Sequence, residues 1–94
     1  MSYKLRFHAL ALAEWHRLDG SLREPLKKKL AERLESPRVP ASALSGMADY
    51  YRIKLRSVGY RLVYRVDEDL VFVAVIAVGK WDKQQVYHPA RSRR

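Results

Sequence analysis

The stretch YRIKLRSVGYRLVYRV, residues 51–66, decides the fold. Apolar and basic residues alternate in its first half, and a similar alternation returns in residues 60–66, which is the two-residue period of strands with one buried face. Residues 57–59, between the two halves, have the composition of a turn. The stretch therefore predicts an antiparallel hairpin with one face on a core and the other face open.

Positive charge gathers on the open face of this predicted hairpin. Residues 50–66 include five cations and no acidic residue. Side chains alternate along a strand, so Arg52, Lys54 and Arg56 share one face. Pairing within the hairpin can bring Arg61 beside Lys54 on that face. Like charges so close repel, and structural surfaces usually mix both signs, so the pattern favours a surface that binds an anion over an ordinary solvated surface.

Before the hairpin, the sequence predicts a strand and two helices. Residues 3–7 alternate between apolar and basic side chains, as a half-buried strand does. Residues 9–18 have apolar side chains at helical spacing, and a second helix opens at Ser21, where Glu24 completes a capping-box pattern. The apolar stripe of this second helix consists of Leu22, Leu26, Leu30 and Leu34. Two helices joined by a short turn indicate a helical hairpin.

The rest of the chain completes a two-layer α+β domain. Residues 36–49 contain two prolines and a glycine and read as a loop. Residues 70–78 are apolar throughout, which is typical of a central strand covered on both faces. Residues 82–90 fit a short C-terminal helix. The expected order is an N-terminal strand, a helical hairpin, a three-stranded antiparallel meander and this short helix, in one domain over residues 1–94.

Composition limits the classes of function. The chain has 19 Lys and Arg against 10 Asp and Glu, a net charge of +9 at pH 7, which attracts polyanions such as RNA. There is no cysteine, and His8, His16 and His88 lack metal-ligand spacing, so no metal site is expected. No glycine-rich phosphate loop occurs, and no cofactor is expected. The apolar run at residues 70–78 is too short to cross a bilayer, so we expect a cytoplasmic protein without a membrane partner.

Six stretches follow one another in the order of a known toxin family. They are residues 14–18 (EWHRL), 26–37 (LKKKLAERLESP), 44–49 (LSGMAD), 51–66 (YRIKLRSVGYRLVYRV), 75–80 (VIAVGK) and 86–87 (VY). On these stretches the chain resembles the RelE toxins of bacterial type II toxin–antitoxin systems. The resemblance implies a microbial-ribonuclease-like fold and a metal-independent endoribonuclease that cuts mRNA in the ribosomal A site. It also implies a cognate RelB-type antitoxin.

The resemblance further implies a set of site residues. The family's active surface uses two lysines on one strand, an arginine on the next, an arginine just after the last strand and a tyrosine near the C-terminus. The matching positions here are Arg52, Lys54, Arg61, Trp81 and Tyr87. The tryptophan departs from the family pattern at the position associated with the leaving 5′ oxygen. Residues nearby that offer a replacement or a stacking role are Lys80, Trp81 itself, Lys83 and His88.

Further cations are expected at the interface with ribosomal RNA or the antitoxin. They are Lys27, Lys28, Lys29, Arg33, Arg56 and Arg65. Contacts of this kind hold phosphates without reading base sequence. Two alternatives compete with an endoribonuclease: a gyrase poison of the ParE type, and a non-catalytic RNA- or ribosome-binding module, which the tryptophan at position 81 allows.

Overall fold

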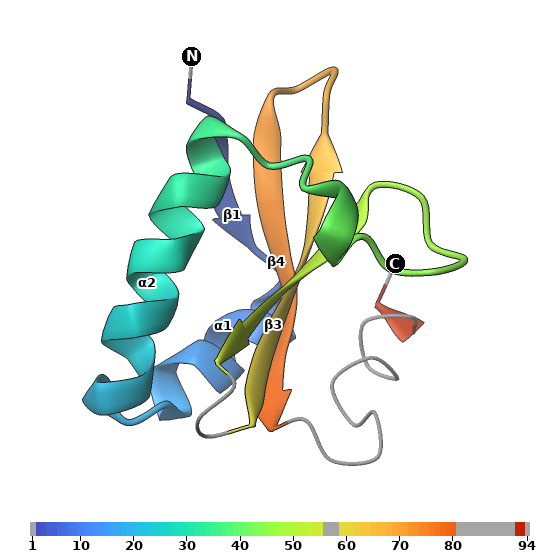
Figure 1. Cartoon of the computed structure of the whole chain (residues 1–94). Helices are drawn as coiled ribbons and strands as arrows, with labels where there is room; N and C mark the ends of the chain where they lie inside the picture. Colours follow the sequence, from blue (N-terminus) through green and yellow to red (C-terminus); the bar gives the residue numbers. More distant parts are fainter. Residues whose placement is uncertain (1, 56–58, 81–91, 94) are drawn as a thin grey trace.

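The computed structural model describes residues 2–55, 59–80 and 92–93. Its elements are β1 (Lys4–Phe7), α1 (Ala9–Arg17), α2 (Gly20–Glu35), the 3-10 turn η1 (Pro40–Ser42), β2 (Tyr50–Leu55), β3 (Tyr60–Asp67) and β4 (Phe72–Lys80). The strands form one sheet in the order β1-β4-β3-β2, and α2 lies over one face of it (Figure 1). The predicted α+β class and order of elements are confirmed. The predicted C-terminal helix at residues 82–90 lies outside the described residues.

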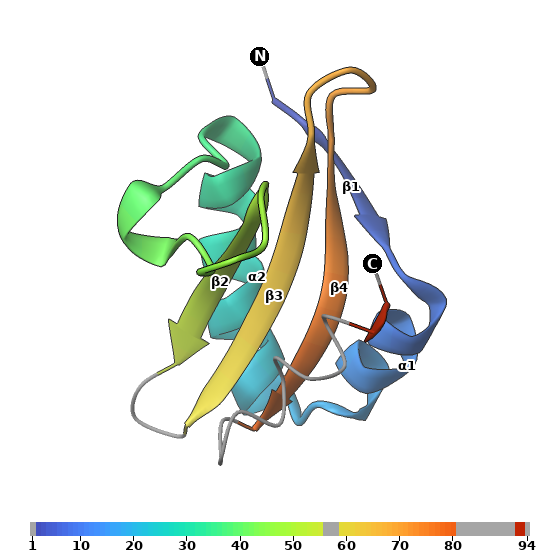
Figure 2. The same cartoon turned by 90° about the vertical axis from the view of Figure 1, so that its right-hand side faces the viewer.

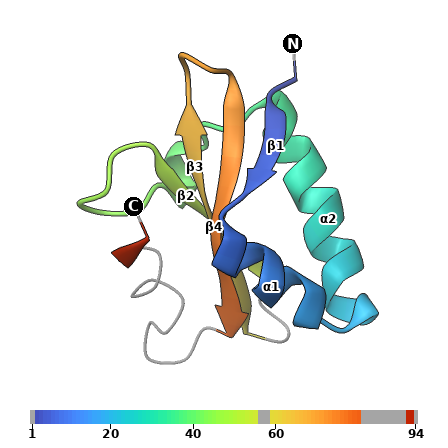
Figure 3. The ribbon, with the colours of Figure 1, turned by 180° about the vertical axis from the view of Figure 1, so that it is seen from behind.

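The pairing of the strands combines a meander with one parallel strand. β2 pairs with β3 and β3 with β4, both antiparallel, as the hairpin pattern predicts. β1 pairs parallel with β4, so the N-terminal strand lies at an edge beside the last strand, and α1 follows it directly (Figure 3). No helix in the described part of the chain is long and apolar enough to span a membrane.

The sheet buries apolar side chains on both faces. On the helix side, Leu26 and Leu30 of α2 pack with Ile53, Leu62 and Tyr64 in one cluster. A second cluster on the opposite face consists of Met47, Tyr50, Val63, Phe72, Ala74, Ile76 and Ala77. Residues 72–78 of β4 are all buried, which confirms the predicted central strand covered on both faces. Figure 2 shows the face opposite α2. We call it the open face after the prediction, although the second cluster is buried there, so the prediction of an open face is wrong for its apolar residues.

A bulge interrupts the β3–β4 ladder. Val63 pairs with Ala77 but Tyr64 pairs with Val75, so Ile76 is the extra residue. The bulge lets Ile76 and Ala77 both join the open-face cluster while Val75 and Val78 join the helix-side cluster. An extra residue of this kind bends the strand and increases its twist.

Two predictions about the ends of elements are wrong. The capping box at Ser21 and Glu24 does not form, because α2 begins one residue earlier at Gly20 and the Ser21 hydroxyl donates to the Asp19 carboxylate instead. The last strand begins at Phe72 and not at residue 70, because the Asp67 carboxylate accepts from the Leu70 N–H and holds that residue in the turn.

The loop at residues 36–49 has more structure than predicted. It contains η1 and an isolated antiparallel bridge between Ala43 and Tyr51. These contacts place the loop against β2, the edge strand that carries Arg52 and Lys54.

Candidate active surface

The β2–β3 hairpin places the predicted cations as expected. Lys54 is the cross-strand partner of Arg61, and Arg52 is the partner of Val63. Directly opposed residues share a face, and Val63 belongs to the open-face cluster. Arg52, Lys54 and Arg61 therefore project from the open face, all of them partly exposed. Strand alternation alone predicted this arrangement, and the register confirms it.

The main chain at Arg52 is held by an arginine of α2. Nη1 of Arg33 donates to the Arg52 carbonyl at 3.2 Å and to the Tyr64 hydroxyl at 2.9 Å, and its Nη2 donates to Oγ of Ser42 at 3.2 Å. The Tyr64 hydroxyl in turn donates to the Pro37 carbonyl at 2.6 Å. Burial raises the pKa of Tyr64, and the Arg33 charge opposes that rise. Arg33 thus connects α2 to the loop, to β2 and to β3.

A basic hollow of about 350 Å³ lies at the β2 edge of the sheet, among α2, η1 and β2. Its lining residues are Lys29, Arg33, Ala41, Ser42, Arg52 and Lys54. Four of these six side chains are cationic and none is acidic. The fold therefore brings two predicted RNA-binding residues of α2, Lys29 and Arg33, next to the strand cations. Lys27 and Lys28 are exposed on α2 and do not line this hollow.

A second hollow, of about 560 Å³, lies on the open face near β1. Its lining residues are Arg6, Phe7, His8, Tyr50, Arg65, Phe72, Ala74, Ile76 and Arg93. Arg65 belongs to the predicted RNA-binding set, whereas Arg6 and Arg93 were missed. Alternation in residues 3–7 places Arg6 on the face opposite the core, but only the pairing of β1 with β4 brings it to this hollow.

Several predicted site residues lie outside the described residues. They are Arg56, Trp81, Lys83, Tyr87 and His88. Lys80 is described, and it is exposed at the end of β4. Its cross-strand partner is Tyr60, which packs on the helix-side core, whereas Arg61 is opposite Gly79. Lys80 therefore occupies a position on the other side of the sheet from Arg61.

The described residues favour charge-based chemistry. They contain no group of three or more His, Asp or Glu side chains that could hold a metal ion. The open face instead presents guanidinium and ammonium groups, which bind phosphate oxygens and stabilise negative charge that develops on them.

Comparison with known proteins assigns the family. The sequence model described as "ParE toxin of type II toxin-antitoxin system, parDE" matches residues 5–84. The mRNA interferase toxin RelE of Escherichia coli is 55% identical over 93 residues, which cover 99% of this chain and 98% of that protein. The free E. coli RelE toxin, solved as a double mutant, superposes with a TM-score of 0.92 at 55% identity, covering 99% of this chain and 98% of that one.

A solved complex of E. coli RelE with its antitoxin gives a further comparison. The toxin in the intact E. coli RelBE toxin–antitoxin complex is 56% identical with a TM-score of 0.84, and the match covers 87% of this chain and all of that chain. These matches confirm the family resemblance that the sequence suggested. The chain therefore belongs to the RelE family, within the RelE/ParE superfamily of type II toxins.

Proposed function

We propose that this protein is the toxin of a type II toxin–antitoxin system and inhibits translation by cutting mRNA in the ribosomal A site. The observation that carries the proposal is the Lys54–Arg61 pair on the open face of a chain that is 55% identical to an mRNA interferase over nearly its full length. The reaction needs no metal or cofactor, because fixed cations supply the charge stabilisation. The protein acts in the cytoplasm, where its ribosomal substrate is found.

The proposed reaction is attack of a ribose 2′-OH on the adjacent phosphate. A 2′,3′-cyclic phosphate forms and a 5′-OH leaves. Arg52 and Arg61 stabilise the charge on the phosphate, since guanidinium groups keep their charge and donate in pairs. Lys54 accepts the 2′-OH proton. An unperturbed lysine is neutral in roughly one molecule in a few thousand at pH 7, and the neutral form is the one that accepts a proton.

Two proposed roles rest on sequence position. Tyr87 stacks on a nucleobase and orients the 2′-OH, as aromatic side chains do on unpaired RNA. Trp81 stands where the family has an arginine, and an indole does not protonate a leaving alkoxide, although it can stack on a base. Lys83 and His88 are then the candidates for the leaving-group step, since Lys80 occupies the opposite side of the sheet from Arg61.

Two macromolecular partners follow from the proposal. One is the ribosome with its mRNA, contacted by the cations of α2 and the hairpin. The other is a cognate RelB-type antitoxin, since E. coli RelE was solved with RelB and with a RelB peptide. An antitoxin neutralises the toxin by covering or distorting the open face.

The decisive experiment uses ribosomes programmed with a defined codon in the A site. Primer extension and end-group analysis of the mRNA should show a cut within that codon, with a cyclic phosphate on one product and a 5′-OH on the other. An intact message in this assay would contradict the proposal.

The match of residues 5–84 to the ParE toxin family keeps a gyrase poison as the second candidate function. A gyrase poison would leave the message intact and trap DNA gyrase on cleaved DNA. Running a gyrase cleavage assay on the same preparation separates the two activities. The full-length identity to an mRNA interferase favours the first.

A further inference from the structure

The hollow beside β1 has a regular origin in the sheet. Arg6 of β1 and Arg65 of β3 are both cross-strand partners of Ala74 in β4. Two strand spacings separate their Cα atoms by about 10 Å, and only the Ala74 methyl group stands between them. Because Ala74 is small, it leaves a hollow above the sheet, and the long side chains of Arg6 and Arg65 flank this hollow. We propose that this hollow binds a backbone phosphate of single-stranded RNA.

Phe72 helps to hold the two arginines in place. The guanidinium carbon of Arg6 lies 4.6 Å from the centroid of the Phe72 ring, and that of Arg65 lies 5.6 Å from it. Cation–π contacts of this kind orient a guanidinium while its N–H groups remain able to bind another partner. Phe72 itself is 7% exposed, so it supports the arginines and offers no stacking surface to a base.

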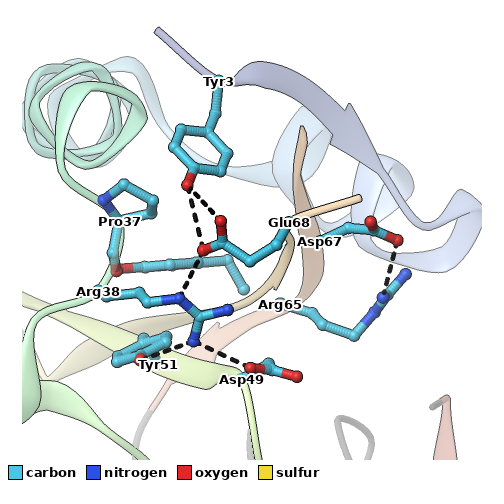
Figure 4. Close-up of polar contacts among 9 residues, drawn as sticks. Tyr3, Pro37, Arg38, Asp49, Tyr51, Arg65, Asp67 and Glu68 are labelled. Atoms are coloured by element: carbon cyan, nitrogen blue, oxygen red, sulfur yellow. Dashed lines mark hydrogen bonds and ion pairs between the residues drawn. The ribbon is translucent and has the colours of Figure 1, made fainter. Parts of the chain in front are cut away.

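The charges around the hollow leave a positive excess. Arg6 is exposed and forms no ion pair within residues 2–55, 59–80 and 92–93. Arg65 has one long ion pair, 3.7 Å to Asp67 (Figure 4). The positive charge of Arg93 is compensated, because its guanidinium group donates to both carboxylate oxygens of Glu14 and also to the Ile76 carbonyl. The uncompensated charge therefore belongs mainly to Arg6 and in part to Arg65.

The N-terminus of α1 adds to this potential. His8 lines the hollow and is the N-cap of α1, where its Nδ1 accepts from the Leu10 N–H at 3.2 Å. A neutral imidazole with Nδ1 as acceptor carries its proton on Nε2, which is then a donor. The first turn of α1 contains no acidic residue, so the positive end of the helix dipole is not compensated there.

RNA is favoured as the ligand because the hollow continues the proposed active surface. Arg61 and Arg65 lie four residues apart on the same face of β3, so about 13 Å separates the two positions along the strand. A strand of RNA that passes the Lys54–Arg61 pair can therefore place a flanking phosphate between Arg6 and Arg65. This inference rests on the proposed function, because that function identifies the ligand as mRNA. The hollow would then be a second site at which the protein contacts the message.

Binding to RNA without ribosomes tests the inference separately from cleavage. The probe is a short single-stranded RNA with 2′-O-methyl groups, which cannot be cut by 2′-OH attack, and the readout is fluorescence anisotropy of the full chain over a salt series. Arg6→Ala and Arg65→Ala should each weaken binding roughly fivefold and reduce the slope of log K against log salt by about 0.7. Arg6→Lys should leave the slope of log K against log salt unchanged, because lysine keeps the positive charge.

Arg17→Ala is the matched control, since it removes one exposed cation from the opposite end of α1 and should leave the slope unchanged. The inference is overturned if Arg6→Ala and Arg65→Ala bind the probe as the unchanged protein does. It is equally overturned if they lose affinity only for an acidic peptide such as oligoglutamate, which would assign the hollow to an acidic protein segment. A protein that cuts no mRNA but shows the slope change would retain this site and lose only the proposed reaction.

Discussion

Lys54 and Arg61 lie directly opposite each other across the β2–β3 hairpin. Like charges in this arrangement repel, so the pair opposes the pairing of the two strands. A phosphate group that binds at the pair would offset this repulsion, so the removal of either cation should cost activity.

Lys54→Ala and Arg61→Ala should each slow A-site cleavage by about 10²–10³, the usual cost of losing one preorganised charge-stabilising group. The same substitutions should change the melting temperature little, because both side chains are partly exposed. Single-turnover cleavage on programmed ribosomes checks the predicted rate, and thermal unfolding checks the predicted melting temperature. Arg17→Ala, a cation lost from α1, should change neither. Cleavage at the unchanged rate in both variants would remove this pair from the active surface.

The fold shows why the Lys54–Arg61 pair could be predicted from the sequence and the second hollow could not. Alternation and a short turn determine which residues of a hairpin face each other, so residues 51–66 specify this contact locally. The position of Arg6 depends on a strand that pairs with β4 across more than sixty residues. Nothing in the alternation of residues 3–7 specifies that partner, its parallel direction or the Ala74 opposite.

The role of Arg33 shows another limit. Its spacing in α2 places it with exposed lysines, and sequence alone assigned all of them to an interface with ribosomal RNA or the antitoxin. The fold gives Arg33 three acceptors on three other segments, including the Arg52 carbonyl. A helical pattern specifies a side of the helix, but it does not specify which neighbouring carbonyl or hydroxyl a long side chain will reach.

Arg33→Met should separate positioning from RNA contact. The variant keeps the apolar stem but loses the hydrogen bonds to Arg52, Tyr64 and Ser42, which should lower the free energy of unfolding by about 1–2 kcal/mol. Cleavage should slow while the salt slope of RNA binding stays constant. Lys29→Met, in the same hollow, should do the reverse, with stability kept and the slope reduced by about 0.7. A reduced slope in Arg33→Met would make it an RNA contact instead.

Trp81→Arg tests the leaving-group step. If this position lacks a group that its relatives use, restoring the arginine should raise the single-turnover cleavage rate about tenfold or more, within the usual range for acid–base assistance. Binding of the 2′-O-methyl RNA should rise only by the effect of one added charge, and Trp81→Lys serves to measure that effect. An unchanged cleavage rate would mean that another residue, such as Lys83 or His88, already assists the leaving oxygen.

Glu68 should make stability depend on pH through its contact with Arg38. Nε of Arg38 donates to the Glu68 carboxylate at 2.6 Å, and the Tyr3 hydroxyl donates to it as well (Figure 4). The Arg38 hydrogen bond, followed by that of Tyr3, lowers the pKa of Glu68 below its ordinary value of 4.5, although the nearby Asp49 opposes the shift. A lowered folded-state pKa stabilises the protein above the unfolded pKa, and this stabilisation is lost as pH falls through the folded value.

Melting temperatures from about pH 6 down to about pH 3 check this dependence. The melting temperature of Glu68→Gln should be lower than that of the unchanged protein at pH 6, and it should fall less steeply as the pH decreases. Asp69→Asn, an exposed carboxylate in the same turn, should keep the original steepness. Because both Glu68 and Arg38 are largely exposed, added salt should reduce the difference between Glu68→Gln and the unchanged protein. Parallel curves for Glu68→Gln and the unchanged protein would contradict the prediction.

Val71 holds a backbone conformation that suits glycine. Its φ is +54°, in the left-handed region, where a β-branched side chain is strained. The side chain is 40% exposed, so little packing is lost when it is removed, and the Val71 carbonyl still accepts from the Lys4 N–H. Val71→Gly should therefore raise the free energy of unfolding by about 0.5–1 kcal/mol, the relief of strain exceeding the added chain entropy. Val71→Ala, which keeps the strain, should show no such gain in urea unfolding; equal gains in both variants would assign the effect to the exposed apolar side chain.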